Sequence, residues 1–214
     1  MIVGIYGSDG FAREVLPIVR MQYDECDEVF FVDDNANLVG QKRNSIEIIS
    51  FERAVELSCK MTIAIADPVL RKSLAEKCTA NGLSFINVIH PNVEIYDEVI
   101  FGVGIIATAN VTFTSNITIG DHFHANIYSY VAHDCVIGDY VTFAPRVCCN
   151  GRVHVEDLAY VGTAAVLRQG SHEKPLVIGA SAIVGMGAVV TKNVAPDTTV
   201  VGNPAKPFPA KSSN

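Results

Sequence analysis

The segment NIYSYVAHDCVIGDY places a histidine directly before an acid, and this pair is a candidate for chemistry. A neutral imidazole can take up a proton near pH 7, and a neighbouring carboxylate can hold the ring in one tautomer. His133 is therefore a candidate general base, with Asp134 as the group that orients it. The alternative is that His133 is an ordinary polar turn residue, and residue type alone leaves that open.

A second candidate lies near the N-terminus, in the turn formed by Gly7, Ser8, Asp9 and Gly10. The turn precedes a predicted helix, whose free N–H groups and dipole can hold a diphosphate. It lacks the full GxGxxG pattern of dinucleotide-binding folds. Asp33 and Asp34 end the next predicted strand and are placed to accept hydrogen bonds from a ribose or a base.

The other histidines raise the alternative of a zinc site together with His133: His122, His124, His154 and His172. Zinc sites draw on closely spaced His, Cys or carboxylate ligands. The spacing of these histidines is irregular, so we expect no metal.

Composition narrows the class of protein. The 214 residues are 49% hydrophobic with a formal net charge of −7, and no apolar run approaches the roughly 18 residues that span a bilayer. The start of the chain lacks the features of a signal peptide. We therefore expect a cytoplasmic protein that does not insert in membranes or bind nucleic acid. Basic residues outnumber acidic ones only in residues 146–214, so only this last part of the chain is suited by its charge to bind a polyanion.

The six cysteines form no CxxC pair, so buried reduced thiols are expected.

Residues 1–90 are predicted to form a small α/β domain, because strand and helix patterns alternate there. The predicted strands are IVGIYG, EVFFVDD, MTIAIAD and LSFINVI, and helices are predicted over 11–21 and from Pro68 to about Asn81. This order indicates a four-stranded, Rossmann-like parallel sheet. Its ligand is expected at the carboxyl ends of the strands, beside the glycine-rich turn, the two aspartates and Ala66.

Residues 91–214 follow a six-residue period instead. Thirteen positions in succession, every sixth from Ile95 to Leu167, are apolar. A fixed short period indicates one unit stacked on itself, here a triangular parallel β-solenoid with eighteen residues per coil. The period resumes only at Ile178, which predicts an external loop near 168–177. In this register His133 lies in a turn column and projects from the solenoid.

The units IGDHFH, IGDYVT, VGTAAV, IGASAI and VGMGAV resemble the hexapeptide repeats of left-handed β-helix acyltransferases, and VVGNPAKPF resembles their closing segment. With GSDGFAREV, the strand ending in VDD and the segment VIHP, the whole chain is similar to bacterial nucleotide-sugar acetyltransferases acting on bacillosamine, perosamine and viosamine precursors. The resemblance implies a left-handed parallel β-helix after the N-terminal sheet. It also implies a homotrimer, with acetyl-CoA between adjacent β-helices and a nucleotide-linked amino sugar held partly by the N-terminal domain.

The same resemblance implies roles for individual residues. The family's catalytic stretch matches Asn126, His133 and Asp134. The acetyl-CoA contacts that we predict are Thr142, Gly151, Gly162, Lys192 and Lys206. The Gly151 N–H would face the thioester oxygen, although a tight turn alone could also require this glycine. The local excess of basic residues favours pairing of the two lysines with the CoA phosphates over simple solvation. The family's glycine-rich turn often carries a His where this chain has Phe11.

These observations predict an acetyl-CoA-dependent N-acetyltransferase for the 4-amino group of a nucleotide-linked 4-amino-4,6-dideoxyhexose, serving surface polysaccharide (O-antigen) biosynthesis. A dTDP-linked sugar of the viosamine type is favoured, with UDP and GDP close behind. The alternatives are an O-acetyltransferase related to the sialic acid group, a zinc-dependent β-helix enzyme and a non-catalytic trimer.

Overall fold

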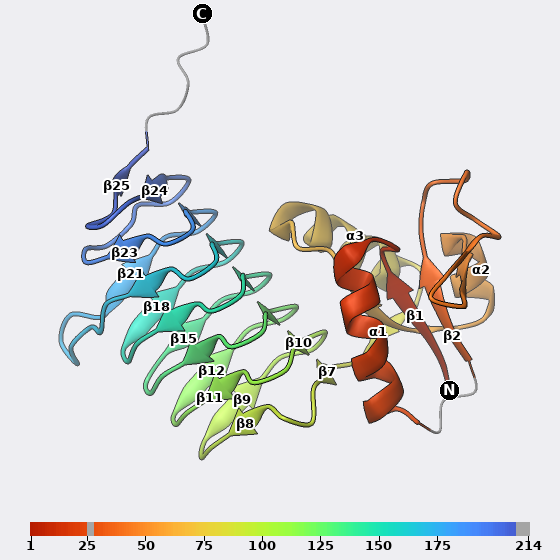
Figure 1. Ribbon diagram of the computed structural model, residues 1–214, viewed down its shortest axis with the longest axis horizontal. Coiled ribbons are helices and arrows are strands. Elements are labelled where there is room, and N and C mark those ends of the chain that lie inside the picture. Colours follow the sequence, from red (N-terminus) through yellow and green to blue (C-terminus); the bar gives the residue numbers. More distant parts are fainter. Residues whose placement is uncertain (25–27, 209–214) are drawn as a thin grey trace, which may run out of the picture.

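The computed structural model describes residues 1–24 and 28–208, which form an α/β part and a β-helix lying side by side (Figure 1). None of the helices within these residues is long and apolar enough to cross a bilayer. The five cysteines of the described residues are free thiols, and all but the half-buried Cys148 are buried; Cys26 lies outside the described residues.

The α/β part contains a six-stranded sheet in the order β3-β4-β2-β1-β5-β6. Its elements are β1 (Ile2–Tyr6), α1 (Gly10–Gln22), β2 (Glu28–Val32), β3 (Lys42–Arg43), β4 (Ile46–Ile49), α2 (Phe51–Glu56), β5 (Lys60–Ile63), α3 (Pro68–Ala80) and β6 (Ser84–Phe85). All neighbours are parallel except β3 and β4. The chain builds outward from β1 in both directions, so the order reverses between β1 and β5, where doubly wound sheets bind ligands.

The predicted four-stranded sheet is wrong in two places. The pair β3 and β4 was not predicted, because β3 is the basic pair Lys42–Arg43 and β4 has four residues interrupted by Glu47. The predicted strand LSFINVI is two strands: β6 ends the α/β sheet, and β7 (Val88–Ile89) pairs with the β-helix. Asn87 fixes this break, since its side chain donates to the Gly102 carbonyl at 3.0 Å and accepts from the Ile105 amide at 3.0 Å.

The β-helix has three parallel faces. The first face consists of β7, β10 (Ile106–Ala107), β13 (His124–Ala125), β16 (Thr142–Phe143), β19 (Tyr160–Val161), β22 (Ile183–Val184) and β24 (Thr199–Val201), with β25 (Lys206–Pro207) antiparallel at its edge. The second face consists of β8 (Glu94–Ile95), β11 (Thr112–Phe113), β14 (Tyr130–Val131), β17 (Cys148–Cys149), β20 (Val166–Leu167) and β23 (Val189–Val190). The third face consists of β9 (Val99–Phe101), β12 (Ile117–Ile119), β15 (Val136–Ile137), β18 (Val153–Val155) and β21 (Leu176–Ile178).

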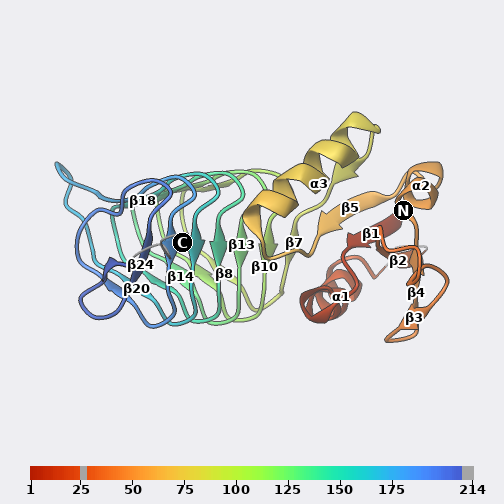
Figure 2. The same cartoon turned by 90° about the horizontal axis from the view of Figure 1, so that it is seen from above.

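The six-residue period is the inward column of this left-handed β-helix. Strands pair with the strand one coil later, so that Phe113 lies beside Val131 and Val131 beside Cys149. These side chains are buried in one continuous core that runs along the axis. Figure 2 shows the coils stacked one behind another. The sequence therefore predicted the architecture correctly, because every coil repeats the same burial pattern.

The corners between faces repeat with the same period. Twelve successive turn residues at six-residue intervals, from Glu98 to Ala164, have a left-handed backbone, and all but Gly104 carry a side chain. Aspartates of three successive coils stabilise one of these corners: Asp121 accepts from the Val103 amide, Asp139 from the Asp121 amide and Asp157 from the Asp139 amide, at 2.8–2.9 Å. Each carboxylate thus satisfies a backbone donor of the preceding coil.

The α/β part packs against the first face and the corner between the third and first faces. Val88 and Ile106 of the first face join the core of the α/β part. The ring of Phe85 meets His122 edge-on with centroids 4.5 Å apart, and the opposite neighbour Tyr140 stacks on the same imidazole at 5.1 Å. His122 is 3% exposed, so the interface holds an imidazole away from water.

Because the His122 imidazole is buried, we expect the stability of the folded protein to decrease at acidic pH. Burial and the nearby Arg71 charge lower the pKa of His122 from 6.5 to about 4. The unfolded chain therefore takes up a proton that the folded protein does not, and the free energy of unfolding falls as the pH drops from about 6.5 to about 4. For this one group the expected loss is on the order of 3 kcal/mol.

Denaturant unfolding at pH 4.5 and pH 7 measures this loss. His122→Asn, which suits the left-handed backbone at that position (φ 54°), should be less stable at pH 7 but show a flatter dependence on pH. His172→Asn, which changes an exposed ring, is the matched control and should keep the wild-type slope. An unchanged slope in His122→Asn would contradict the assignment.

Candidate active site

His133 and Asp134 form the corner that joins β14 on the second face to β15 on the third face. The imidazole is partly open to solvent, with 42% of its side chain exposed. Its Nδ1 lies 2.8 Å from Oδ2 of Asp134. A carboxylate at this nitrogen holds the proton on Nδ1, which leaves the Nε2 lone pair free to accept a proton from another molecule.

Asp134 is held in place by its backbone and by a cation. Its backbone is left-handed (φ 60°), a conformation that aspartate tolerates better than most residues. Arg152, one coil later in the same turn column, places Nη2 3.2 Å from the same Oδ2 atom that contacts His133. The His133 hydrogen bond and the Arg152 charge lower the pKa of Asp134, so the carboxylate stays ionised while it orients the imidazole.

Gly151 lies against the imidazole of His133. A methyl group built on its Cα would lie 2.6 Å from both Cε1 and Nε2 of the ring. The left-handed residue of this corner is Arg152 (φ 58°), so the turn itself does not require glycine at 151. Within residues 1–24 and 28–208, no acceptor is bonded to the Gly151 N–H. The glycine thus leaves room for the ring and presents an amide donor beside it.

Gly151→Ala is therefore expected to lower kcat while leaving the fold intact. The added methyl group must push the ring away from its contact with Asp134, and a displacement of about 1 Å costs roughly 100-fold in rate. Steady-state kinetics and thermal unfolding on the same sample measure both effects. A variant with wild-type kcat would show that the ring position does not matter.

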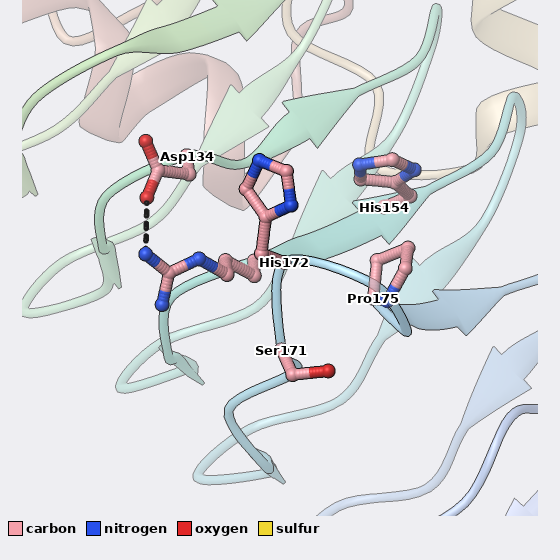
Figure 3. A pocket seen from close by; sticks show the side chains of 6 residues that line it. Asp134, His154, Ser171, His172 and Pro175 are labelled. Carbon is pink, nitrogen blue, oxygen red and sulfur yellow. Dashed lines mark ion pairs between the residues drawn. The ribbon is translucent and has the colours of Figure 1, made fainter.

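An open cavity of about 390 Å³ adjoins this corner and is lined by Asp134, Arg152, His154, Ser171, His172 and Pro175 (Figure 3). The last three residues belong to the loop between β20 and β21, which projects from the β-helix at the same corner as His133 (Figure 1). The external loop therefore forms one wall of a cavity that Asp134, the partner of the His133 ring, also lines.

A second cavity, of about 270 Å³, lies at the carboxyl ends of β1, β2 and β5. We call it the crevice; its lining consists of Tyr6, Gly7, Val32, Asp33, Asp34, Ile65, Leu70 and Leu74. Gly7 has φ +104°, which favours glycine, and Asp9 precedes the first turn of α1 without capping it by its side chain. Added side-chain atoms at Gly10 would meet nothing within 4 Å, so the start of the helix is open to a ligand.

The two aspartates of the crevice already have partners. Asp33 accepts from the Ser8 hydroxyl at 2.6 Å and from the Asn35 amide at 3.0 Å. Asp34 accepts from the Tyr6 hydroxyl at 2.8 Å and pairs with Lys77 at 2.8 Å. Burial and the Asp34 carboxylate raise the pKa of Tyr6, so its hydroxyl remains a donor. Both carboxylates are thereby oriented, with lone pairs left for a ligand.

The structure does not bring Asn126 to His133 within one chain. Asn126 lies at the corner between the first and second faces, where its side-chain amide donates to the Phe143 carbonyl at 2.8 Å. Asn150 makes the same kind of bond, to the Leu167 carbonyl at 2.8 Å, at the corner between the second and third faces. The amide group of Asn126 is therefore part of the corner, and a catalytic role would need its remaining oxygen and a neighbouring copy.

The predicted acetyl-CoA contacts are dispersed. Gly151 and Lys192 lie at the corner that carries His133, Gly162 lies at the corner between the first and second faces, and Lys206 lies in β25. Thr142 does not fit the predicted contact: it is 1% exposed, and its hydroxyl donates to the Ala66 carbonyl at 2.8 Å in the interface between the two parts. The carbonyl of Ala66 points into the same interface, so the backbone of this predicted nucleotide-site residue supports the crevice from behind.

The histidines fall into separate groups. His122 and His124 are buried beside the α/β part, whereas His154 and His172 line the cavity near Asp134. In the part of the chain that the structure describes, no group of three His, Cys, Asp or Glu side chains is placed to hold a metal ion.

Three polar residues of these sites were not predicted. Arg152 follows Asp134 by eighteen residues in the same turn column, so the period itself could have identified it. Lys77 follows Leu70 and Leu74 on one helical face, a spacing that points to a shared environment. Arg43, which contacts Asp9 at 2.9 Å, comes from the unpredicted strand β3 and has no sequence signal.

The crevice and His133 lie on opposite sides of one β-helix. Side-chain contacts of the α/β part reach the first face and the corner before it, as in the ring contact of Phe11 with His124. His133 lies at the corner between the second and third faces, which is opposite the first face. In Figure 1 the α/β part is on the right and the external loop of that corner on the left. The packed core of the β-helix stands between the two cavities.

Known proteins resemble this chain over nearly its whole length. Residues 3–78 match the sequence family described as the PglD N-terminal domain. The chain is 47% identical over 212 residues to the GDP-perosamine N-acetyltransferase of Escherichia coli O157:H7, which covers 96% of this chain and 95% of that protein. The structure is similar to WeeI from Acinetobacter baumannii AYE, with a TM-score of 0.94, 48% identity and coverage of 97% and 100% of the two chains. It is also similar to PerB from Caulobacter crescentus in complex with CoA and GDP-perosamine, with a TM-score of 0.87, 28% identity and 98% coverage of each chain.

Proposed function

Because the chain belongs to the PglD-type nucleotide-sugar N-acetyltransferases with a hexapeptide β-helix, we propose that its acceptor is a GDP-linked 4-amino-4,6-dideoxyhexose, with perosamine as the favoured sugar. The enzyme N-acetylates a nucleotide-linked 4-amino sugar with acetyl-CoA. The E. coli relative is a GDP-perosamine N-acetyltransferase and PerB was solved in complex with GDP-perosamine, which favours GDP over the dTDP-linked sugar that the sequence suggested. The N-acetyltransferase activity of the E. coli relative, which covers 96% of this chain, favours N-acetylation over the O-acetyltransferase, zinc-enzyme and scaffold alternatives.

The observation that carries the chemistry is the free Nε2 of His133, with Nδ1 held by Asp134 at 2.8 Å. The sugar amine attacks the thioester carbonyl, its proton passes to Nε2, and a carbon–nitrogen bond forms. The developing oxyanion accepts from the Gly151 N–H. When the carbon–sulfur bond breaks, the imidazolium returns the proton to the CoA thiolate, and the amide and free CoA leave.

The position of the crevice supports a shared active site in a homotrimer. A nucleotide sugar bound in the crevice is separated by the β-helix core from His133 of its own chain, so the catalytic imidazole must come from a neighbouring copy. In a cyclic trimer every crevice can face the next copy's corner. Light scattering should give a trimeric mass, and a monomeric mass at micromolar concentration would contradict the proposal.

A thiol-release assay tests the substrate. Acetyl-CoA is supplied with GDP-, UDP- and dTDP-linked 4-amino-4,6-dideoxyhexoses, and mass spectrometry identifies the N-acetylated product. GDP-perosamine is expected to give the highest kcat/KM. The matched control is the corresponding GDP-sugar with a 4-hydroxyl group, which should release no CoA. Preference for the dTDP or UDP sugar would refute the nucleotide assignment, and turnover of the hydroxyl sugar would refute N-acetylation.

A further inference from the structure

A fully buried arginine joins the two parts of the molecule. Arg71, on α3 of the α/β part, is 0% exposed. Among the residues that the structure describes, its guanidinium donates only to neutral oxygens: Ile65 O at 2.6 Å, Ala66 O at 3.1 Å, His122 O at 3.0 Å, Tyr140 O at 2.6 Å, Val141 O at 3.3 Å and Thr142 Oγ1 at 2.9 Å. A cation buried without a carboxylate is expensive unless its donors are all satisfied, so this set of acceptors is a specific arrangement.

The acceptors come from three segments that are distant in the chain. Ile65 and Ala66 follow β5 beside the point where the strand order reverses, and Ile65 lines the crevice. The other acceptors belong to two successive coils of the β-helix at the corner between its third and first faces. Thr142 completes the link, since its hydroxyl accepts from Arg71 and donates to the Ala66 carbonyl at 2.8 Å.

The same link supports the helix that forms one wall of the crevice. Asp67 accepts from the Leu70 amide at 2.8 Å and so begins α3, whose Leu70 and Leu74 line the cavity. One side of the crevice is thus hydrogen-bonded directly to the β-helix, while the side that carries Asp33 and Asp34 reaches it through the sheet and through packing of α1, as in the ring contact of Phe11 with His124. Moving this bond would turn the crevice relative to the β-helix.

We propose that Arg71 is a positioning residue that fixes the direction in which the crevice presents the amino sugar to His133 of the neighbouring copy. The inference rests on the proposed function, in which the β-helices assemble the trimer and the crevice holds the nucleotide. The orientation of the crevice on its own β-helix then determines where the sugar amine meets the neighbouring imidazole. Thr142 is the second member of the same link.

Lysine cannot replace Arg71 in this role. Burial lowers the pKa of Arg71 to about 9, so it remains a cation at neutral pH. A lysine in the same place starts from a lower pKa and offers three donors at one point, whereas the guanidinium spreads five over a plane. Arg71→Lys is therefore a strong perturbation, and Thr142→Val, which removes one hydroxyl at nearly constant volume, is a mild one.

The experiment compares two acceptors in Thr142→Val, Thr142→Ser and Arg71→Lys. One acceptor is the nucleotide sugar that the wild-type enzyme uses best, and the other is the methyl glycoside of the same 4-amino sugar, which has no nucleotide to occupy the crevice. Thr142→Val should lower kcat on the nucleotide sugar about 10-fold, and Arg71→Lys about 100-fold, because misplacement acts on the transfer step. The KM values of both substrates should stay within about threefold, the rate on the methyl glycoside should not change, and Thr142→Ser should resemble the wild type.

Amide hydrogen exchange gives a readout that needs no turnover. Exchange over residues 64–70 should accelerate at least about 10-fold in Thr142→Val but not in Thr142→Ser. Equal losses on both acceptors, a change confined to KM, or unchanged exchange would each overturn the positioning role. If the wild-type enzyme acetylated no nucleotide sugar, the proposed function would fail, while the exchange data would still report whether Arg71 and Thr142 hold the crevice.

Discussion

His133→Ala is expected to lower kcat by a factor on the order of 10²–10⁴, which is the usual contribution of a general base. The variant removes the Nε2 lone pair that would take the amine proton in the proposed mechanism, in which Nδ1 is held by Asp134 at 2.8 Å. Neither substrate is bound through the ring in the proposed mechanism, so both KM values should stay within a few-fold of wild type. Steady-state kinetics with thiol detection measure all three constants.

The pH dependence distinguishes a base from a merely structural ring. A limb of the wild-type kcat/KM profile that reports a general base should vanish in His133→Ala. A limb due to the sugar amine itself would remain in both. Asp134→Asn is the matched control, because asparagine suits the left-handed backbone (φ 60°) and still offers an oxygen to Nδ1. Asp134→Asn should lower kcat less than His133→Ala does. If His133→Ala kept nearly the wild-type kcat, the ring would have no catalytic role, and proximity and the Gly151 amide would be the sources of the rate.

The sequence predicted the β-helix well because its stability depends on a one-dimensional repeat. Each inward residue is buried by the residues one coil before and after it, so the period can be read without knowing any distant contact. The same regularity placed His133 on an outward corner and Asp134 beside it, as the structure has them. The external loop was visible as an interruption of the period.

Features that depend on contact between the two parts were not predictable in this way. Thr142 has the pattern of any first-face residue, yet its hydroxyl is committed to Ala66, a residue from a segment 76 positions away. The strand predicted over 83–89 changes sheets at Asn87, because side-chain bonds to Gly102 and Ile105 outweigh its continuous apolar pattern. In the sequence, Arg71 has the pattern of an ordinary exposed cation on a helix. Only the fold shows that its side chain is buried among carbonyl groups.

The second large effect is expected from mixing two inactive variants. Leu70→Trp should block the crevice, since Leu70 lines it and its side chain is 48% exposed, so that a larger ring can fill the cavity without disturbing the core. His133→Ala leaves the crevice intact and removes the base. Each variant alone should have roughly 1% of wild-type activity or less. Co-expression at equal levels, with the same tag on both variants, gives randomly assorted trimers that are purified together.

If the crevice of one copy works with His133 of the next, random trimers of the two variants should regain about a quarter of wild-type activity, because that fraction of interfaces pairs an open crevice with an intact histidine. A site contained within one chain would regain none. The matched control is the Leu70→Trp, His133→Ala double variant co-expressed with wild type. A shared site predicts about a quarter of full activity there too, whereas a site within one chain predicts about half. The β-helix core that separates the crevice from His133 in each chain leads us to expect equal rescue in the two mixtures.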